Sequence, residues 1–281
     1  MSIRKQTLSA AGVRQALRAH ADPERARALA RFFKTGPGEY AAGDTFWGIG
    51  VPPQRAIARQ FAALPLDELL KLLQSPVHEQ RLTALLILVR QFERADEHGR
   101  QERFRFYVRH LAYVNNWDLV DSSAHKIAGE YLLSRTRGER ELLYRLARSK
   151  NLWRRRVSII ASAAFINAGD ARDTLALAEI LLGDEHDLIH KAVGWMLREV
   201  GKRIDRKVLL EFLRQHAVAM PRTALRYSIE HLPASERAAW LAMRAERAAR
   251  PTMPRVRTRG ASPRAKLQPE AELSKPLLQK K

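Results

Sequence analysis

The sequence predicts an all-α protein, and three observations support this. Apolar residues recur at spacings of three and four along residues 9–248, as at Leu66, Leu69, Leu70 and Leu73, and this is the helical period. Alternating patterns typical of strands are nearly absent. Proline and glycine interrupt the apolar pattern so often that the intervening segments have about 10 to 18 residues, the ordinary length of helices in globular proteins.

The interruptions divide the chain into successive helical segments. They occur at Pro23, Gly36 to Gly38, Pro52 and Pro53, Pro65, Pro76, Gly99, Gly138, Gly169, Gly183, Gly201, Pro221 and Pro233. Two segments also carry a start signal, because Pro52 and Pro53 precede residues 54–64 and Asp170 precedes residues 171–182.

The spacing of the segments predicts how they pack. Short helices joined by loops of about 2 to 6 residues tend to pair antiparallel, and stacked pairs of about 40 residues form a HEAT-like helical-repeat solenoid. Because no consensus string repeats along the chain, a compact helical bundle is the alternative. A solenoid curves into a concave face, and we expect that face to be basic.

The composition points to a polyanionic partner. The chain has 281 residues, with 50 Lys and Arg against 30 Asp and Glu, a formal net charge of +20. Nucleic acid is the first expectation and an anionic membrane surface the second. No apolar run is long enough to span a membrane, so we expect a location in the cytoplasm, in the bacterial cytosol or nucleoid. The absence of cysteine excludes disulfides, thiolate metal sites and cysteine nucleophiles.

The last 32 residues differ in composition from the rest of the chain. Prolines are interspersed among basic residues in 250–281, which predicts a basic, Pro-rich disordered tail after a single domain at 1–249. Nine Lys and Arg against two Glu give this tail a net charge of +7, which leaves +13 on residues 1–249. The basic signal therefore does not come from the tail alone.

The first candidate site is the string Asn115-Asn116-Trp117-Asp118-Leu119-Val120-Asp121. On a helix, Trp117 and Asp121 share a face, whereas Asp118 points about 100° away from Trp117. An indole face and a carboxylate together suit a cationic ligand. Alternatively, Asn116 or Asp118 caps the helix and Trp117 fills the core.

Two further strings combine tryptophan with basic residues. Leu152-Trp153-Arg154-Arg155-Arg156 places three arginines in three directions, so one or two could clamp a phosphate, or all could form a solvated helix end. In the string 191–199, Lys191 and Trp195 share a face, and Gly194 lets another group approach the indole closely. A core tryptophan is the alternative there.

His186 and His190 have the spacing of a zinc-binding helix. Asp187 takes the place of the usual glutamate, and no third ligand can be identified by spacing. We therefore expect no metal and no other cofactor.

Taken together, these strings resemble the DNA alkylation repair family of HEAT-like DNA glycosylases, the AlkD type. The resemblance covers about residues 25–232 and depends on the combination of strings. The matching strings are Phe46-Trp47-Gly48-Ile49 with Pro52 to Arg55, Trp117-Asp118 through Asp121, Leu152-Trp153 through Arg156, and Lys191 through Glu199.

The resemblance implies roles for individual residues. The family's catalytic aspartate falls on Asp121, its two DNA-facing tryptophans on Trp117 and Trp195, and its backbone-binding arginine on Arg156. We expect three further DNA contacts at Lys191, Trp153 and Arg55. A tyrosine that family members contribute from the first helix pair falls on Phe32 only if a longer 36–44 segment is allowed for.

The resemblance implies a metal-free DNA glycosylase that removes purines alkylated at N3 or N7 from duplex DNA and so initiates base excision repair. The chemistry of the residues is compatible with this, because an alkylated purine and the sugar it leaves both carry positive charge. We expect a monomer. The alternatives are a non-catalytic HEAT-like scaffold that binds nucleic acid, and a solenoid that binds an acidic protein.

Overall fold

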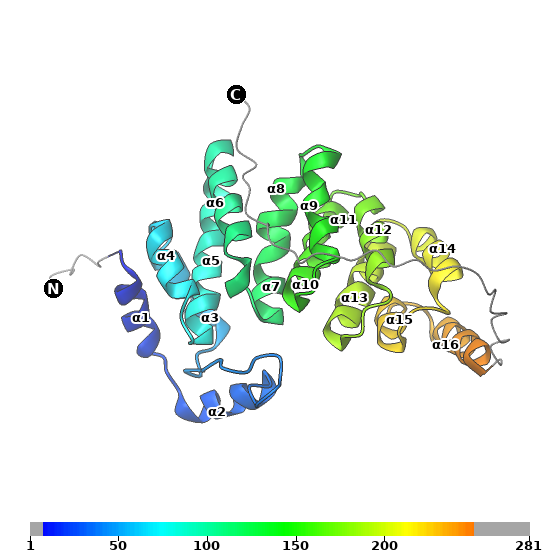
Figure 1. Cartoon of the computed structure of the whole chain (residues 1–281), viewed down its shortest axis with the longest axis horizontal. Coiled ribbons are helices and arrows are strands. Elements are labelled where there is room, and N and C mark those ends of the chain that lie inside the picture. The colour runs from blue at the N-terminus through cyan, green and yellow to red at the C-terminus, as the bar shows by residue number, and fades with distance from the viewer. Residues whose placement is uncertain (1–7, 250–281) are drawn as a thin grey trace, which may run out of the picture.

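The computed structural model describes residues 8–249, and within that range the chain folds almost entirely into helices (Figure 1). The predicted all-α class is confirmed. Pairing of extended backbone in this part of the chain is limited to one isolated bridge between Thr45 and Val77. The predicted tail, 250–281, lies outside the described residues.

The helices are short and follow one another closely. In chain order they are α1 (Ala10–Arg18), α2 (Pro23–Phe32), α3 (Val51–Gln60), α4 (Leu66–Leu73), α5 (His78–Arg94), α6 (Glu97–Arg109), the 3₁₀ turn η1 (Leu111–Tyr113), α7 (Trp117–Ala124), the π-helical turn η2 (His125–Gly129), α8 (Glu130–Leu133), α9 (Arg137–Ala147), α10 (Leu152–Ala161), α11 (Ala163–Asn167), α12 (Arg172–Leu181), α13 (Asp187–Arg203), α14 (Arg206–His216), α15 (Arg222–Ser228) and α16 (Ala234–Ala249).

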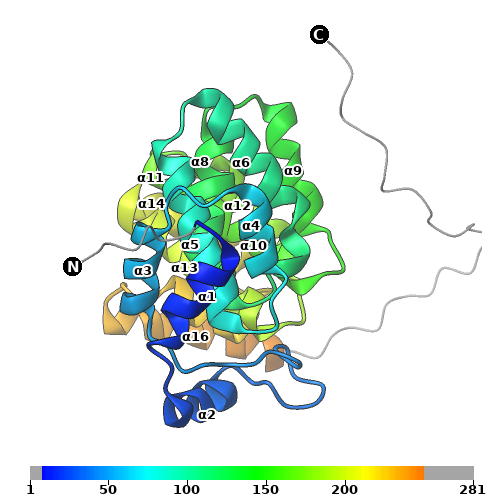
Figure 2. The same cartoon turned by 90° about the vertical axis from the view of Figure 1, so that its left-hand side faces the viewer.

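The helices form a two-layered repeat. In one layer, α3, α5, α7, α10, α13 and α15 pack against one another in that order. In the other layer, α4, α6, α8, α9, α12 and α14 each pack against the first layer or against η2, which continues α7. Figure 1 shows the two layers following a shallow arc, with α2 set apart below them, and Figure 2 shows the same arrangement from the N-terminal end. This is an all-α helical repeat fold.

The helical apolar pattern becomes a continuous core. In α4, for example, Leu69, Leu72 and Leu73 are at most 2% exposed, as their spacing predicts. The core extends without a break from α1 to α15. Among residues 8–249, no helix is both long and apolar enough to cross a membrane.

The predicted start signals are present, with one shift in boundary. Asp170 accepts a hydrogen bond from the Arg172 backbone N–H at 3.0 Å, next to the start of α12. Pro52 and Pro53 lie inside the first turn of α3, which begins at Val51, instead of preceding it. Proline is tolerated there because the first helical N–H groups have no partner within the helix.

At two glycines near the candidate site, two backbone segments approach each other more closely than any other residue would allow. Gly48 has a φ of +80°, and a Cβ there would lie 2.0 Å from the Asp22 carbonyl oxygen, so the segment after α2 can pass this close only with glycine. Gly129, at the end of η2, would place a Cβ 2.2 Å from the carbonyl oxygen of Ala161. The chain that carries Trp117 and Asp121 is therefore pressed directly against α10.

Candidate active site

Two neighbouring cavities meet at Trp117. One, of about 670 Å³, is lined by Trp117, Trp195 and Lys191 among others, and we call it the Trp195 cavity. The second, of about 560 Å³, is lined by Trp117 and Asp121, and we call it the Asp121 cavity. Phe32 lines both. Candidate residues from the strings 115–121, 152–156 and 191–199 therefore lie around Trp117.

The first turn of α7 holds Trp117 and Asp121 together. The Asn116 side chain accepts a hydrogen bond from the Trp117 backbone N–H at 2.8 Å and caps the helix. Leu119 and Val120 are fully buried and anchor the opposite face. Trp117 and Asp121 both line the Asp121 cavity, as their four-residue spacing predicts.

Asp121 forms a two-point ion pair with Arg156. Its oxygens accept hydrogen bonds from Nε of Arg156 at 2.9 Å and from Nη2 at 2.8 Å. The Nη1 group of Arg156 donates to the backbone oxygen of Leu188. The side chain of Arg156 is 6% exposed and that of Asp121 is 18% exposed. The Arg156 side chain is therefore buried, whereas the Asp121 carboxylate remains partly accessible from the Asp121 cavity.

Burial is the main influence on the acidity of Asp121. It raises the pKa of this carboxyl above the ordinary value of 3.8, and the negative charge of Asp118 acts in the same direction. The hydrogen bonds and positive charge of Arg156 lower the pKa and partly offset the burial. Arg156 is therefore the group that favours the ionised form of Asp121.

Asp118 belongs to a second, separate network. Although Asp118 was expected to point away from Trp117, it also lines the Asp121 cavity, and its Oδ2 lies 2.7 Å from Nε2 of His78. On its other side, Nδ1 of His78 lies 3.3 Å from Asp44, which also binds Arg81 at 2.5 Å. Burial lowers the pKa of His78, but the hydrogen bonds to Asp118 and Asp44 outweigh it, and the pKa lies above 6.5.

Aromatic rings surround the indole of Trp117. The Phe33 ring is stacked on it, with ring centres 5.2 Å apart and planes 10° apart. Phe32 makes an edge contact at 6.0 Å and is 64% exposed, so this ring is free to meet a ligand. Tyr40 lines the Trp195 cavity together with Trp117, and burial raises the pKa of its phenol.

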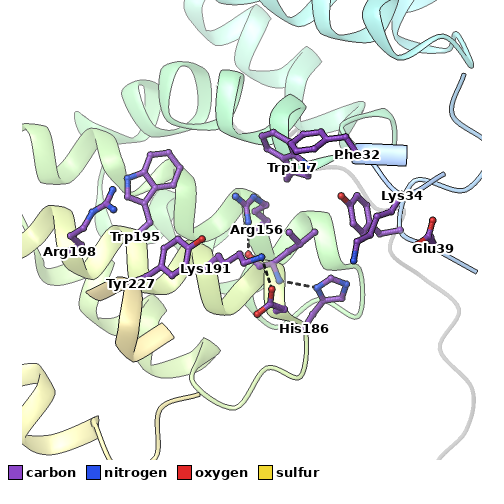
Figure 3. Close-up of a pocket in the computed structure, with 13 residues that line it drawn as sticks. Phe32, Lys34, Glu39, Trp117, Arg156, His186, Lys191, Trp195, Arg198 and Tyr227 are labelled. Atoms are coloured by element: carbon purple, nitrogen blue, oxygen red, sulfur yellow. Dashed lines mark hydrogen bonds and ion pairs between the residues drawn. The ribbon is translucent and has the colours of Figure 1, made fainter. Parts of the chain in front are cut away.

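The opposite wall of the Trp195 cavity is formed by α13 and α15. A Cβ on Gly194 would lie 2.4 Å from the Ala224 carbonyl oxygen and 2.5 Å from the Tyr227 Cβ, so the group that approaches this glycine is α15. Tyr227 thereby lines the cavity beside Trp195. Figure 3 shows Tyr227 and Trp195 on one side of the cavity and Lys34 on the other.

The four predicted DNA contacts differ in accessibility. Lys191 is 41% exposed and pairs with Asp187 at 2.7 Å, and Arg55 is an exposed residue at the Asp121 cavity. Arg156 is covered and engaged with Asp121. Trp153 is 7% exposed and lies in the core, where it leaves little surface for a DNA contact.

The two histidines with zinc spacing are used for helix capping and backbone contact. Nδ1 of His186 accepts a hydrogen bond from the Leu188 N–H at 3.1 Å and caps α13. Nε2 of His190 lies 2.5 Å from the backbone oxygen of Asp184. Within the described part of the chain, no three His, Asp or Glu side chains are grouped so that they could hold a metal ion.

Sequence reasoning missed four residues of this site, namely Phe33, Tyr40, His78 and Tyr227. All four reach it through contacts between segments far apart in the chain, which no local pattern encodes. The one local signal was the length of the segment 36–44, which contains Tyr40.

One family model matches most of the chain. A family model described as DNA alkylation repair enzyme matches residues 13–232. Among solved structures, the chain is similar to a "Predicted DNA alkylation repair enzyme from Enterococcus faecalis", with a TM-score of 0.60 and 18% identity over 76% of this chain and 98% of that chain. At this level of identity the likeness concerns the fold. The comparison with curated proteins finds no match.

Proposed function

This chain belongs to the DNA alkylation repair enzyme family, and from that premise we propose that it is a DNA glycosylase. It hydrolyses the N-glycosidic bond of purines alkylated at N3 or N7 in duplex DNA. The observation that carries this proposal is the open edge of Asp121, which lines the same cavity as Trp117 and is held by the covered Arg156.

The arrangement suits a reaction in which positive charge develops on the sugar. An N3- or N7-alkylated purine is cationic, and its departure leaves an oxocarbenium-like deoxyribose. The carboxylate of Asp121 stabilises that cation electrostatically, and the indole faces of Trp117 and Trp195 attract positive charge. Catalysis of this kind needs the ionised carboxylate.

Asp121 has a second role in directing water. Each carboxylate oxygen accepts one hydrogen bond from Arg156, and an ionised carboxylate has about four acceptor positions. About two positions remain beyond those that Arg156 occupies, and one of them accepts a proton from the attacking water. Neither role requires a metal or cofactor.

The ion pair also reconciles a carboxylate with a DNA-binding surface. An unpaired Asp121 would repel the phosphate backbone, whereas the pair with Arg156 is neutral as a unit. Lys191 and Arg55, which are exposed, supply attraction to phosphate at the two cavities. We therefore assign Arg156 as a positioning residue for Asp121, in place of the phosphate clamp expected from the sequence.

The direct test is release of free base from methylated duplex DNA. The purified protein should liberate 7-methylguanine and 3-methyladenine in the presence of a metal chelator, measured by chromatography of the soluble fraction. A protein that binds the duplex but releases no base would be a nucleic-acid scaffold instead. A protein that binds neither damaged nor intact duplex would favour an acidic protein partner.

The role of Arg156 gives a prediction about pH. In Arg156→Gln, Asp121 loses the group that lowers its pKa, so the acid limb of the excision rate should move to higher pH by about 1 to 3 units. Single-turnover rates from pH 4 to 9, taken below the melting temperature of the variant, measure this shift.

The same variant separates the two roles considered for Arg156. If it positions Asp121, the variant should lose affinity for undamaged duplex only at pH values where Asp121 is ionised, because the unpaired carboxylate then repels the phosphates. Where Asp121 is protonated, the affinity should be unchanged. A phosphate clamp would instead lower the slope of log K against log salt by about 0.9 without moving the acid limb.

A further inference from the structure

His78, the first residue of α5, connects segments that are far apart in the sequence. Its backbone N–H donates to the carbonyl oxygen of Thr45 at 2.9 Å. Its side chain is 2% exposed and lies between Asp44, on the segment that leads toward α3, and Asp118, in the first turn of α7. The imidazole therefore links the helix of the proposed catalytic residues to a segment more than 70 residues earlier in the chain.

Both ring nitrogens of His78 face a carboxylate oxygen. Nδ1 lies 3.3 Å from Oδ2 of Asp44, and Nε2 lies 2.7 Å from Oδ2 of Asp118. A neutral imidazole has one N–H and one lone pair, so it donates to only one of these oxygens, whereas an imidazolium donates to both. The arrangement therefore favours the charged ring. In agreement, burial lowers the pKa of His78, but the hydrogen bonds to the two carboxylates outweigh it and the pKa is raised.

The charged side chains around His78 point the same way. Arg81 is a positive group that faces the ring, but its Nη2 is 3.5 Å from Nδ1 and is itself bonded to Asp44 at 2.5 Å. Two negative charges and one positive charge therefore surround the ring, and a proton on His78 makes the four side chains neutral together. Glu79 is engaged elsewhere, because its carboxylate accepts the backbone N–H groups of residues 47–49.

The His78 ring also packs against the aromatic rings behind Trp117. Phe46 is stacked on it with ring centres 4.7 Å apart, and the Phe33 ring lies at 4.9 Å. Phe33 is in turn stacked on the Trp117 indole. Aromatic rings attract positive charge, so the imidazolium strengthens these contacts. His78 thus supports Trp117 in two ways, through Asp118 next to it in α7 and through Phe33 on one face of the indole.

We propose that His78 is a positioning residue for Trp117, and that excision of a cationic lesion is fastest when its ring is an imidazolium bonded to both Asp44 and Asp118. The inference rests on the proposed glycosylase function and deepens it. When the ring loses its proton, one nitrogen presents a lone pair to a carboxylate, and that contact becomes repulsive. Trp117 then loses the support of its neighbour, while the pair of Asp121 with Arg156 is left intact.

The direction of the pH effect follows from the raised pKa of His78. The two contacts are complete below the ordinary value of 6.5 and are lost as pH rises through the pKa of His78 in the folded protein. The excision rate should therefore have an alkaline limb. Burial lowers the pKa values of His125 and His186, so these two rings titrate on the other side of 6.5 and do not produce this limb.

The test compares two aspartate-to-asparagine variants of the full chain. Asp44→Asn removes one of the two carboxylates that favour the charged ring, and Asp44 lines neither cavity. The matched control is Asp173→Asn, because Asp173 also pairs with an arginine, Arg140 at 2.8 Å, and lines neither cavity. The two side chains are 7% and 10% exposed, so both variants should lower the melting temperature, but only the first touches His78.

The first measurement is the pH titration of the His78 ring in a ¹H–¹³C correlation spectrum. The chain has nine histidines, and the His78 signal is identified by its absence from His78→Gln or by through-space contacts to the Phe46 ring. In Asp44→Asn its midpoint should fall by about 1 unit or more, whereas Asp173→Asn should leave it in place. A wild-type midpoint at or below pH 6.5 would overturn the proposal.

The second measurement is single-turnover excision of 7-methylguanine at saturating protein from pH 6 to 9, with spontaneous release subtracted and below the melting temperature of each variant. The wild-type rate should fall about tenfold across the alkaline limb, because the indole is misplaced. The limb should share its midpoint with the His78 signal and move with it in Asp44→Asn. A limb that stays in place while the His78 signal moves would refute the positioning role.

The indole N–H signal of Trp117, identified as the one absent from Trp117→Phe, gives a readout that does not depend on catalysis. It should shift with pH at the midpoint of His78, in the wild-type protein and in Asp44→Asn alike. An indole signal that does not follow His78 would contradict the link between the two rings. If the wild-type protein releases no base, the proposed function fails, and this signal alone decides whether His78 positions Trp117.

Discussion

Asp121→Asn should lower the single-turnover rate of 7-methylguanine release by about 10²- to 10³-fold, the effect of losing one preorganised electrostatic group. Asparagine keeps the size of the side chain and one acceptor oxygen but cannot carry the negative charge that the developing sugar cation needs. Duplex affinity should stay equal or rise, because a charge of the same sign as the phosphates is removed. Rates and affinities on one lesion-bearing oligonucleotide measure both effects.

Controls for this variant have to separate charge at the site from charge elsewhere. Glu93→Gln removes an exposed carboxylate that is 51% accessible and 3.9 Å from Lys126, and it should leave excision unchanged. Asp118→Asn tests whether the loss of excision is specific to the position of Asp121 on the helix. It also disturbs the buried contact with His78, so its melting temperature must be measured alongside. A loss in Glu93→Gln equal to that in Asp121→Asn would remove Asp121 from its assigned role.

The choice of lesion should give the second large effect. Cationic lesions such as 7-methylguanine and 3-methyladenine bring their own positive charge to the glycosidic bond, so they leave without protonation by the protein. Uracil and hypoxanthine are neutral and need either an acid or a base-reading pocket. We therefore expect these neutral bases not to be excised.

The contrast should lie in the chemical step. Matched duplexes present the same phosphates to Arg55 and Lys191, so their affinities should differ little while their single-turnover rates differ by several orders of magnitude. The measurement uses oligonucleotides of one sequence, each with a single lesion. Comparable rates for uracil and 7-methylguanine would exclude charge stabilisation as the basis of selectivity.

The fold could be predicted from the sequence because its determinants are local. Apolar spacing, proline and glycine breaks and capping residues such as Asn116 act within one helix, and each is visible in a short window. The pairing of Trp117 with Asp121 was predictable for the same reason, because residues four apart share a face of one helix.

The rest of the site depends on distant contacts. Asp121 and Arg156 are 35 residues apart, so the sequence suggested a phosphate ligand where the structure has an ion pair. Trp153 occurs in a basic string that suggests DNA contact, yet its ring points into the core. His78 looked like one of several scattered histidines, because its two carboxylate partners come from different parts of the chain.

The π-helical turn η2 has a consequence for how this protein can change over time. An α-helix turns by about 100° per residue, and a wider turn shifts the register between the segments on either side. Before η2, α7 directs Trp117 and Asp121 to the cavities, and after it, α8 buries Tyr131 against Phe104. The two segments therefore no longer share one helical face. A substitution that restored regular α-helical geometry at η2 would therefore rotate α8 within the core or α7 at the cavities, although it contacts neither Trp117 nor Tyr131.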